Sequence, residues 1–271
     1  MNVEPDTSRV AAFFDVDGTL FPEPSLERRY FRFLRRRKQI PPGNYLLWLV
    51  EAFRLAPKGL LQMFHGNKAY LSSVRHGEKS LFADWQIEVG KLPSYREAFE
   101  RAAWHARQGH LLVLVTGTLE PLALHAASLL KAALRQLGCE AAVHVCATQL
   151  EKQNGRWSGR VAGEAMFGKA KARGIRQLAS SWRLDLAQCS AYGDSANDRW
   201  MLESVGRPFA VNPTRGLRRI ARLYHWPVIV WRERTSPCKE NARNCSSGAT
   251  GHNNGAFPDQ TIAPAVREVA E

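Results

Sequence analysis

Long apolar runs are absent from this sequence, and so is the apolar core of a signal peptide. No stretch approaches the roughly 20 uninterrupted apolar residues that a membrane-spanning helix needs. The nearest candidate, residues 45–64, is interrupted by Glu51, Arg54, Pro57 and Lys58. The first ten residues, MNVEPDTSRV, hold no apolar run of the kind found in signal peptides. We therefore expect no transmembrane segment and no secretion signal.

Cysteine is scarce, and its spacing favours reduced thiols. The five cysteines are Cys139, Cys146, Cys189, Cys238 and Cys245, and no two of them form a C-x-x-C pair. A structural zinc site needs closely spaced Cys or His ligands, and a disulfide framework needs an even number of cysteines. Free thiols are typical of cytoplasmic proteins, so we expect a cytoplasmic location.

Acidic residues are outnumbered, with 25 Asp and Glu against 38 Lys and Arg and a formal net charge of +13. Such a charge attracts anions of every kind, including phosphate esters, nucleic acid and acidic lipid surfaces. The densest basic cluster is the segment RRYFRFLRRRK, residues 28–38. We interpret it as the solvated face of a helix, with contact to nucleic acid or to an anionic surface as the alternative.

Short apolar runs alternate with helical stretches over most of the chain. The expected strands are residues 10–14, 111–115, 141–146 and 189–192, with 208–211 and 228–231 as edge strands. The expected helices are residues 95–107, 120–137, 169–182 and 197–204. The pair Asn154-Gly155 predicts a small hairpin before the third of these helices. This alternation predicts an α/β fold with a doubly wound, Rossmann-like parallel sheet.

Residues 23–92 interrupt the alternation with apolar residues at helical spacing and without a clear strand. The clearest example comprises Leu46, Leu47, Leu49, Val50 and Phe53. The segment is too long for a loop, so we interpret it as a helical cap inserted after the first strand. The core domain then comprises residues 8–22 and 93–232. Residues 233–271 are rich in Ser, Asn, Gly and Pro, and we expect them to be disordered.

Two carboxylates follow the first expected strand directly, in Asp15-Val16-Asp17-Gly18-Thr19-Leu20. Ligand sites of parallel sheets lie beyond the carboxyl ends of the strands, so acids at this place indicate chemistry. Alternation along an extended chain puts Asp15 and Asp17 on the same side. Two buried carboxylates need a counter-charge, and Mg²⁺ prefers such oxygen ligands. The structural alternative is a surface turn, in which Asp-Gly pairs are common.

A second acidic segment follows the strand expected at residues 189–192. It consists of Gly193-Asp194-Ser195-Ala196-Asn197-Asp198, and Asp194 is well placed as a second metal ligand. Ser195 or Asn197 alone is explained equally well as a helix cap. That explanation does not account for Asp194 and Asp198, which flank the turn.

Two weaker signals come from polar residues where helices begin. Thr116-Gly117-Thr118 offers a hydroxyl and backbone N–H groups to an anion, although Thr118 alone fits a helix N-cap. Lys169 and Lys171 lie in the first turn of the third expected helix, where a single lysine is usually solvated. Both signals gain weight only together with the acidic segments.

In order and spacing, these four segments resemble the motifs of the haloacid dehalogenase-like hydrolases over about residues 10–232. Motif I resembles residues 15–19, motif II looks like Thr116, motif III like Lys171 and motif IV like residues 193–198. The phosphoserine-phosphatase-like branch fits best, because its helical cap also lies between motifs I and II. Lys171, followed by Ile175 and Leu178, matches the motif III pattern, and Lys169 is the alternative.

The resemblance implies a two-step phosphatase reaction with Mg²⁺ as cofactor. Asp15 is then the nucleophile that forms an aspartyl-phosphate. Asp17 is the acid that protonates the leaving alcohol and the base that activates the water. The metal ligands implied are the carboxylates of Asp15 and Asp194 and the backbone carbonyl of Asp17.

The resemblance also implies supporting roles for five other residues. Thr116, Gly117 and Lys171 would hold the phosphoryl oxygens. Asp198 would orient Lys171 or a metal-bound water, and Thr19 would steady the motif I loop.

The substrate implied is a small phosphorylated metabolite, with phosphoserine, histidinol phosphate and a lipid-precursor phosphate all open. The cap residues closest after motif I are Glu27, Arg28, Arg29 and Arg32. A phosphotransferase on the same scaffold would share every motif and would use an alcohol in place of water. A basic protein that binds nucleic acid or a membrane surface is the alternative from another class, and it is supported by the net charge of +13.

Overall fold

The computed structural model describes residues 9–58, 66–74, 83–86 and 92–232. The chain divides into two compact units, Met1–Ser236 and Pro237–Glu271, and the fold described below belongs to the first. Residues 233–271, which we expected to be disordered, lie outside the described residues. Among the helices that the structure describes, none is both long enough and apolar enough to cross a membrane.

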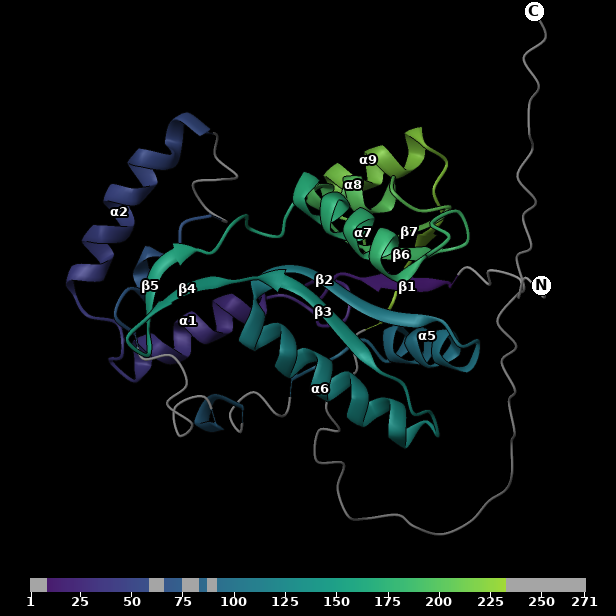
Figure 1. Ribbon diagram of the computed structural model, residues 1–271, viewed down its shortest axis with the longest axis horizontal. Helices are drawn as coiled ribbons and strands as arrows, with labels where there is room; N and C mark the ends of the chain where they lie inside the picture. Colours follow the sequence, from purple (N-terminus) through teal and green to yellow (C-terminus); the bar gives the residue numbers. More distant parts are fainter. Residues whose placement is uncertain (1–8, 59–65, 75–82, 87–91, 233–271) are drawn as a thin grey trace, which may run out of the picture. The chain divides into compact units, whose positions relative to one another are not determined.

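A six-stranded parallel sheet forms the centre of the first unit (Figure 1). Its strands are β1 (Ala11–Phe14), β2 (Leu111–Leu119), β3 (Val143–Thr148), β6 (Ser190–Gly193), β7 (Arg207–Val211) and β8 (Val228–Ile229). Their order is β3-β2-β1-β6-β7-β8, so the chain extends the sheet on one side of β1 and then on the other. The predicted doubly wound fold is confirmed. Its topological switch point lies at the carboxyl ends of β1 and β6, where ligands bind in such sheets.

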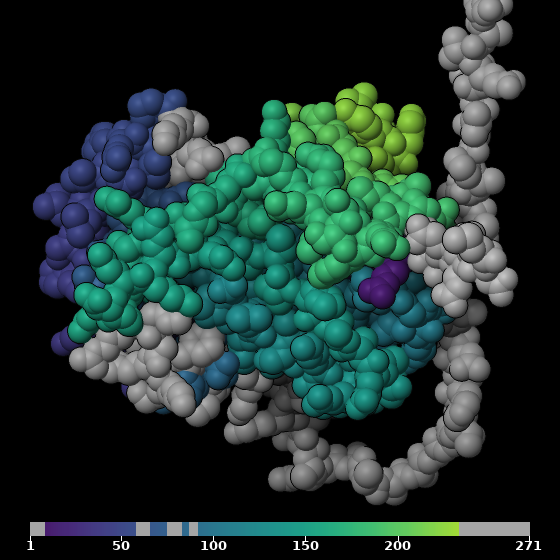
Figure 2. Space-filling model, in the orientation of Figure 1, coloured from purple at the N-terminus to yellow at the C-terminus, as the bar shows by residue number. Residues whose placement is uncertain are grey.

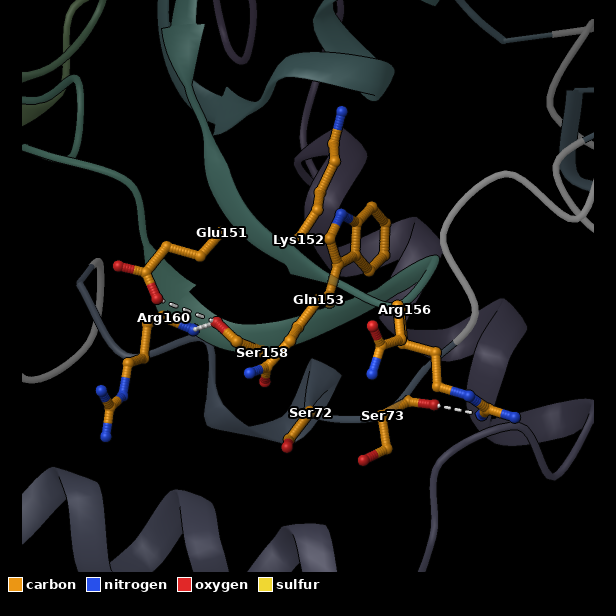
Figure 3. A pocket seen from close by; sticks show the side chains of 10 residues that line it. Ser72, Ser73, Glu151, Lys152, Gln153, Arg156, Ser158 and Arg160 are labelled. Carbon is orange, nitrogen blue, oxygen red and sulfur yellow. Dashed lines mark hydrogen bonds between the residues drawn. The ribbon is translucent and has the colours of Figure 1, made fainter.

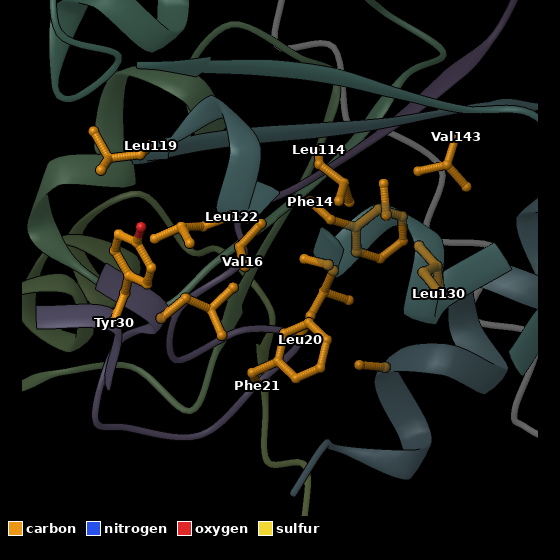
Figure 4. Packing of buried hydrophobic residues seen from close by; sticks show 14 of the residues in the cluster. Phe14, Val16, Leu20, Phe21, Tyr30, Leu114, Leu119, Leu122, Leu130 and Val143 are labelled. Atoms are coloured by element: carbon orange, nitrogen blue, oxygen red, sulfur yellow. The ribbon is translucent and has the colours of Figure 1, made fainter. Parts of the chain in front are cut away.

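Helices cover both faces of this sheet, and each face has its own apolar core. The helices are α5 (Arg96–Arg107), α6 (Glu120–Gln136), α7 (Lys169–Trp182), α8 (Arg199–Leu202) and α9 (Arg215–Leu223). Phe14 and Leu114 pack with α5 and α6, whereas Phe13 and Val113 pack with α7, α8 and α9. Figure 4 shows the first of these clusters around Phe14, Leu114 and Leu130. All four residues of β1 are buried, as expected for a central parallel strand.

One expected helix differs in the structure, and one helix of the structure was not expected. The helix expected at residues 197–204 is a 3₁₀ turn, η3 (Ala196–Asp198), followed by the one-turn helix α8. Helix α9 was not expected, because only Leu217 and Ala221 of this arginine-rich helix are buried. Its apolar pattern is therefore too short to stand out.

Strand β2 continues beyond residue 115, where we expected it to end. Thr116 still pairs with Ala147, and then the register shifts so that Leu119 pairs with Thr148. Gly117 and Thr118 lie within this bulge. Because a bulge re-aims the side chains of its strand, it sets the direction of the polar groups at the end of β2.

The described part of residues 23–92 is helical, and it contains no strand. Its elements are α1 (Leu26–Arg36), α2 (Gly43–Leu55) and the 3₁₀ helices η1 (Ala56–Lys58) and η2 (Ala69–Leu71). Ser25 caps α1 by accepting a hydrogen bond from the Arg28 N–H. The buried face of α1 comprises Leu26, Tyr30, Phe33 and Leu34. The basic residues Arg28, Arg32 and 35–38 are exposed, as both the solvated-face interpretation and the surface-contact alternative require.

The predicted hairpin is present as β4 (Leu150–Gln153) and β5 (Arg156–Val161). Asn154 and Gly155 both have positive φ, 50° and 71°, as the tightest hairpin turn requires. The hairpin also contacts the helical segment 23–92, because Ser73 N donates to Trp157 O at 2.8 Å and Trp157 N donates to Val74 O at 3.1 Å. No motif or spacing in the sequence indicated this contact.

His105 of α5 contributes to the way in which the free energy of unfolding changes with pH. Its Nε2 lies 2.8 Å from the Tyr192 hydroxyl and its Nδ1 lies 2.8 Å from the Nδ1 of His110. Burial, and secondarily His110, lower the pKa of His105 from 6.5 to about 3. The unfolded chain therefore binds a proton below about pH 6.5 that the folded chain does not bind. Taken alone, the contribution of His105 to the free energy of unfolding decreases as the pH falls through this window.

We predict that His105→Gln lowers the slope of the free energy of unfolding against pH between pH 5 and 6.5, because the positive contribution of His105 to that slope is lost. One proton accounts for a slope of at most about 1.4 kcal/mol per pH unit, which is the largest reduction we expect. Urea denaturation at several pH values measures the slope. The exposed His225→Asn serves as the control and should keep the wild-type slope. An unchanged slope in His105→Gln would contradict the assignment.

Candidate active site

Three carboxylates meet at the switch point of the sheet. One oxygen from each of Asp15, Asp194 and Asp198 lies within 4.8 Å of the other two. Burial is the main cause that raises the pKa of Asp15 to about 7 and the pKa of Asp194 to about 9, and the neighbouring carboxylates add to it. An all-oxygen donor set of this kind fits a hard divalent cation, whose charge would offset the repulsion. The predicted ligands Asp15 and Asp194 are therefore close together, and Asp198 joins them.

Lys171 is the cation that the structure places among these carboxylates. Its Nζ donates to Asp15 Oδ1 and to Asp198 Oδ1, each at 2.6 Å, and its side chain is buried. Burial alone would lower the pKa of Lys171, but the carboxylates of Asp15 and Asp198 raise it above its ordinary value. Lys169, the alternative motif III lysine, is exposed. The structure therefore favours Lys171 over Lys169.

Asp198 is held in place by the start of η3. Its Oδ2 accepts hydrogen bonds from Ser195 N at 2.9 Å and from Ser195 Oγ at 2.8 Å, which forms a capping box. Its other oxygen, Oδ1, remains for Lys171. Ser195 is thus a helix cap, and its capping interaction also orients the carboxylate that binds Lys171.

Gly18 allows the two acidic segments to approach each other. Its φ is +79°, and a Cβ at this position would lie 2.4 Å from Asp194 Oδ2. Any other residue would therefore be strained and would displace Asp194. The glycine of motif I is explained by this close approach.

Asp17 faces the helical segment rather than the three-carboxylate cluster. Its Oδ1 accepts a hydrogen bond from Leu26 N at 2.7 Å, and its Oδ2 accepts one from Thr118 Oγ1 at 2.6 Å. Burial raises the pKa of Asp17 although both hydrogen bonds oppose the shift. Taken alone, Thr118 was interpreted as an N-cap, but the N-cap of α6 is Leu119. Thr118 is a site residue that we missed.

Thr116, Gly117 and Thr19 line the same region. Thr116 Oγ1 accepts a hydrogen bond from Thr118 N at 3.1 Å, and Gly117 O accepts one from Thr148 Oγ1 at 2.8 Å. Both contacts hold the bulge at the end of β2. Thr19 is fully buried, and its Oγ1 has no hydrogen-bond partner among the described residues.

Four residues close after motif I were expected in the cap. Among them, Glu27 forms a charge network with a buried partner. It accepts hydrogen bonds from Lys68 Nζ at 2.5 and 2.6 Å and from the Tyr70 hydroxyl at 2.8 Å. Arg29 donates to the carbonyls of Pro22 and Pro24, whereas Arg28 and Arg32 are exposed. Nothing in the sequence spacing pointed to Lys68 or Tyr70.

An open pocket lies beside the hairpin, apart from these residues. Figure 3 shows its lining, which comes from β4, β5 and the end of η2. Arg156 crosses it to donate to Ser73 O at 2.7 Å. None of the predicted site residues lines this pocket, so its size does not bear on the chemistry.

Known proteins resemble this chain over most of its length. A family model described as haloacid dehalogenase-like hydrolase matches residues 12–203. Phosphoserine phosphatase SerB1 of Mycobacterium tuberculosis is 36% identical over 230 residues, which cover 80% of this chain and 70% of that protein. A probable phosphatase of the same species is 31% identical over 231 residues, which cover 82% of this chain and 75% of that protein.

Solved structures share the fold. A protein of unknown function from Bordetella pertussis Tohama I is 28% identical with a TM-score of 0.62, covering 82% of this chain and 99% of that one. A substrate-bound phosphoserine phosphatase is 17% identical with a TM-score of 0.55, covering 83% and 94%. Because the family match takes in β1, α7 and the acidic turn after β6, the chain belongs to the haloacid dehalogenase-like hydrolase family, and its relatives place it among the phosphatases of the phosphoserine-phosphatase-like branch.

Proposed function

We propose that this protein hydrolyses a phosphate monoester of a small metabolite, with Asp15 as the nucleophile and Mg²⁺ as the cofactor. The observation that carries the proposal is the 2.6 Å contact between Lys171 Nζ and Asp15 Oδ1 at the carboxyl end of β1. Lys171 holds the Asp15 carboxylate in one orientation and offsets its charge as a phosphate group approaches.

The residues that would hold Mg²⁺ are the carboxylates of Asp15 and Asp194 and the backbone carbonyl of Asp17. When bound, the ion supplies positive charge that offsets the carboxylates and the phosphoryl oxygens. The close grouping of Asp15, Asp194 and Asp198 supports a cation at this place.

In the first step, an Asp15 carboxylate oxygen attacks phosphorus, and the bond from phosphorus to the ester oxygen breaks. Asp17 gives its proton to the leaving alcohol. In the second step, Asp17 takes a proton from a water molecule that attacks the aspartyl-phosphate, which releases phosphate and regenerates Asp15. The raised pKa of Asp17, caused by burial, favours the protonated form that the first step needs.

The phosphoryl oxygens would bind to the Thr116 hydroxyl, the Gly117 N–H and Lys171. The bulge at the end of β2 fixes the first two groups, and α7 fixes the third. Asp198 orients Lys171 by accepting a second hydrogen bond from its Nζ. Thr19, the last residue of motif I, is fully buried, and its role would be to steady that loop.

We propose that residues 23–92 form a cap on a core of residues 8–22 and 93–232. The hydrogen bond from Leu26 N to Asp17 Oδ1 joins the first residue of α1 to the site. Burial is the main cause that raises the pKa of Asp17, and the charges of Glu23 and Glu27 add to it. The names of the relatives make phosphoserine the first candidate substrate, with histidinol phosphate and a lipid-precursor phosphate to be tested beside it.

We predict that Asp15→Asn lowers phosphate release by about 10³-fold or more, because the amide is not a nucleophile. The assay uses the three candidate substrates, with Mg²⁺ and with EDTA, and EDTA should abolish the wild-type activity. Glu203→Gln on the surface of α8 is the matched control and should stay active. Full activity of Asp15→Asn would exclude Asp15 as the nucleophile. Addition of an acceptor alcohol tests for phosphotransfer, in which a phosphorylated alcohol replaces free phosphate.

We predict that Lys171→Met lowers activity by about 10²-fold or more and destabilises the metal-free protein by about 3 kcal/mol. The change leaves Asp15 and Asp198 buried without their cation. Urea denaturation in EDTA gives the stability, and phosphate release gives the activity. The exposed neighbour provides the control, because Lys169→Met should change stability by less than about 0.5 kcal/mol. Equal effects of the two variants would reject the assignment of Lys171.

A further inference from the structure

Helix α2 is apolar around most of its circumference, yet only one of its sides is buried. Asn44 and Ala52 are buried, and Trp48 packs partly against the core. The outward residues are large and apolar, with Leu46 65% exposed and Phe53 74% exposed. A helix that is apolar all round is normally buried, and a contiguous exposed apolar patch marks an interaction site.

The exposed residues form one stripe. We define the α2 face as Tyr45, Leu46, Leu49, Val50 and Phe53, all of which are exposed. At about 100° per residue they fall within an arc of about 140° on the helix. Figure 1 shows α2 at the periphery of the described fold, and Figure 2 shows the same segment on the surface.

The inner side of α2 is anchored by hydrogen bonds, so the α2 face is held outward. Asn44 Nδ2 donates to Tyr70 O at 3.0 Å and to Ser72 O at 2.6 Å. Asn67 Nδ2 donates to Trp48 O at 2.8 Å. Rotation of α2 to bury its apolar face would break all three bonds.

Basic residues flank the α2 face. Only four residues, 39–42, separate the exposed cluster 35–38 from Gly43, where α2 begins. At the other end of α2, the Arg54 side chain is 72% exposed. Residues 35–58 contain six Lys and Arg and a single acidic residue, Glu51. The apolar stripe therefore has a positive border.

This charge distribution favours an acidic lipid surface over a second copy of the chain. A two-fold contact through the α2 face would bring the basic clusters of both copies together, and like charges oppose such an interface. An anionic bilayer gains from both features, because the apolar stripe enters the acyl boundary while the basic residues contact lipid phosphates. The helix is about 20 Å long, too short to cross the roughly 30 Å hydrocarbon layer.

We propose that the α2 face docks this protein on anionic lipid bilayers, with α2 lying in the plane of the headgroups and residues 35–38 on the lipid phosphates. The α2 face shares no residue with the candidate active site. Helix α1 lies between them in the chain: its first residue, Leu26, contacts Asp17, and its last turn leads to the basic cluster 35–38. Docking and catalysis can therefore be altered independently.

The test is sedimentation of the full chain with vesicles. Equal parts of phosphatidylglycerol and phosphatidylcholine should bind the protein at low salt, pure phosphatidylcholine should bind it at least tenfold less, and high salt should weaken the first interaction. Leu46→Gln/Val50→Gln/Phe53→Gln should lower binding at least tenfold, and Arg35→Gln/Lys38→Gln should lower it and reduce its salt dependence. Activity on a soluble phosphate ester should stay at the wild-type level in both variants.

The matched control removes exposed apolar side chains elsewhere. Leu223 and Val230 are 74% and 70% exposed, so Leu223→Gln/Val230→Gln should bind vesicles as the wild type does. As a second measurement, Phe53→Cys carrying an environment-sensitive fluorophore should report an apolar surrounding on anionic vesicles only.

Three outcomes would overturn the proposal. The first is absence of binding to anionic vesicles at low salt together with an unchanged fluorophore. The second is wild-type binding by the triple α2 variant. The third is a partner of another kind. A dimer that the triple α2 variant abolishes would assign the α2 face to a second copy of the chain. Binding to duplex DNA without binding to vesicles would assign the basic cluster to nucleic acid.

Discussion

The ion-pair cluster around Lys171 is the constraint on which the rest of the site depends. Asp15, Asp194 and Asp198 are brought together by a sheet whose strands β1 and β6 are neighbours, and Lys171 from α7 is the buried cation between two of them. Three carboxylates against one ammonium leave an excess of negative charge. Buried charge without a partner is strongly unfavourable, so the cluster fits a divalent cation.

Backbone details serve the same cluster. Gly18 leaves room for Asp194, and Gly193 leaves room for Asp198, because a Cβ at Gly193 would lie 2.6 Å from the Asp198 Cβ. Ser195 holds one oxygen of Asp198 so that the other faces Lys171. The turn after β6 is therefore shaped by the position of a carboxylate as much as by the start of a helix.

Asp17 connects this core to the helical segment, and the segment divides its charges between two tasks. At the near end of α1, Leu26 N holds Asp17, while Glu27 pairs with the buried Lys68. At the far end, the basic residues 35–38 are exposed beside the apolar face of α2. The net charge of +13 is therefore unevenly distributed, with acids gathered in the site and part of the basic excess on a helix that leads away from it.

The sequence by itself determined the order of strands and helices, the hairpin at Asn154-Gly155 and the acids at the ends of β1 and β6. Apolar period, turn residues and strand ends are local properties, so neighbouring residues suffice to reveal them. Only the tertiary structure decided that Lys171 reaches Asp15, that Thr118 binds Asp17 and that Lys68 pairs with Glu27. These contacts join residues 156, 101 and 41 positions apart, and they exist because the parallel sheet and the packing of its helices bring distant segments together.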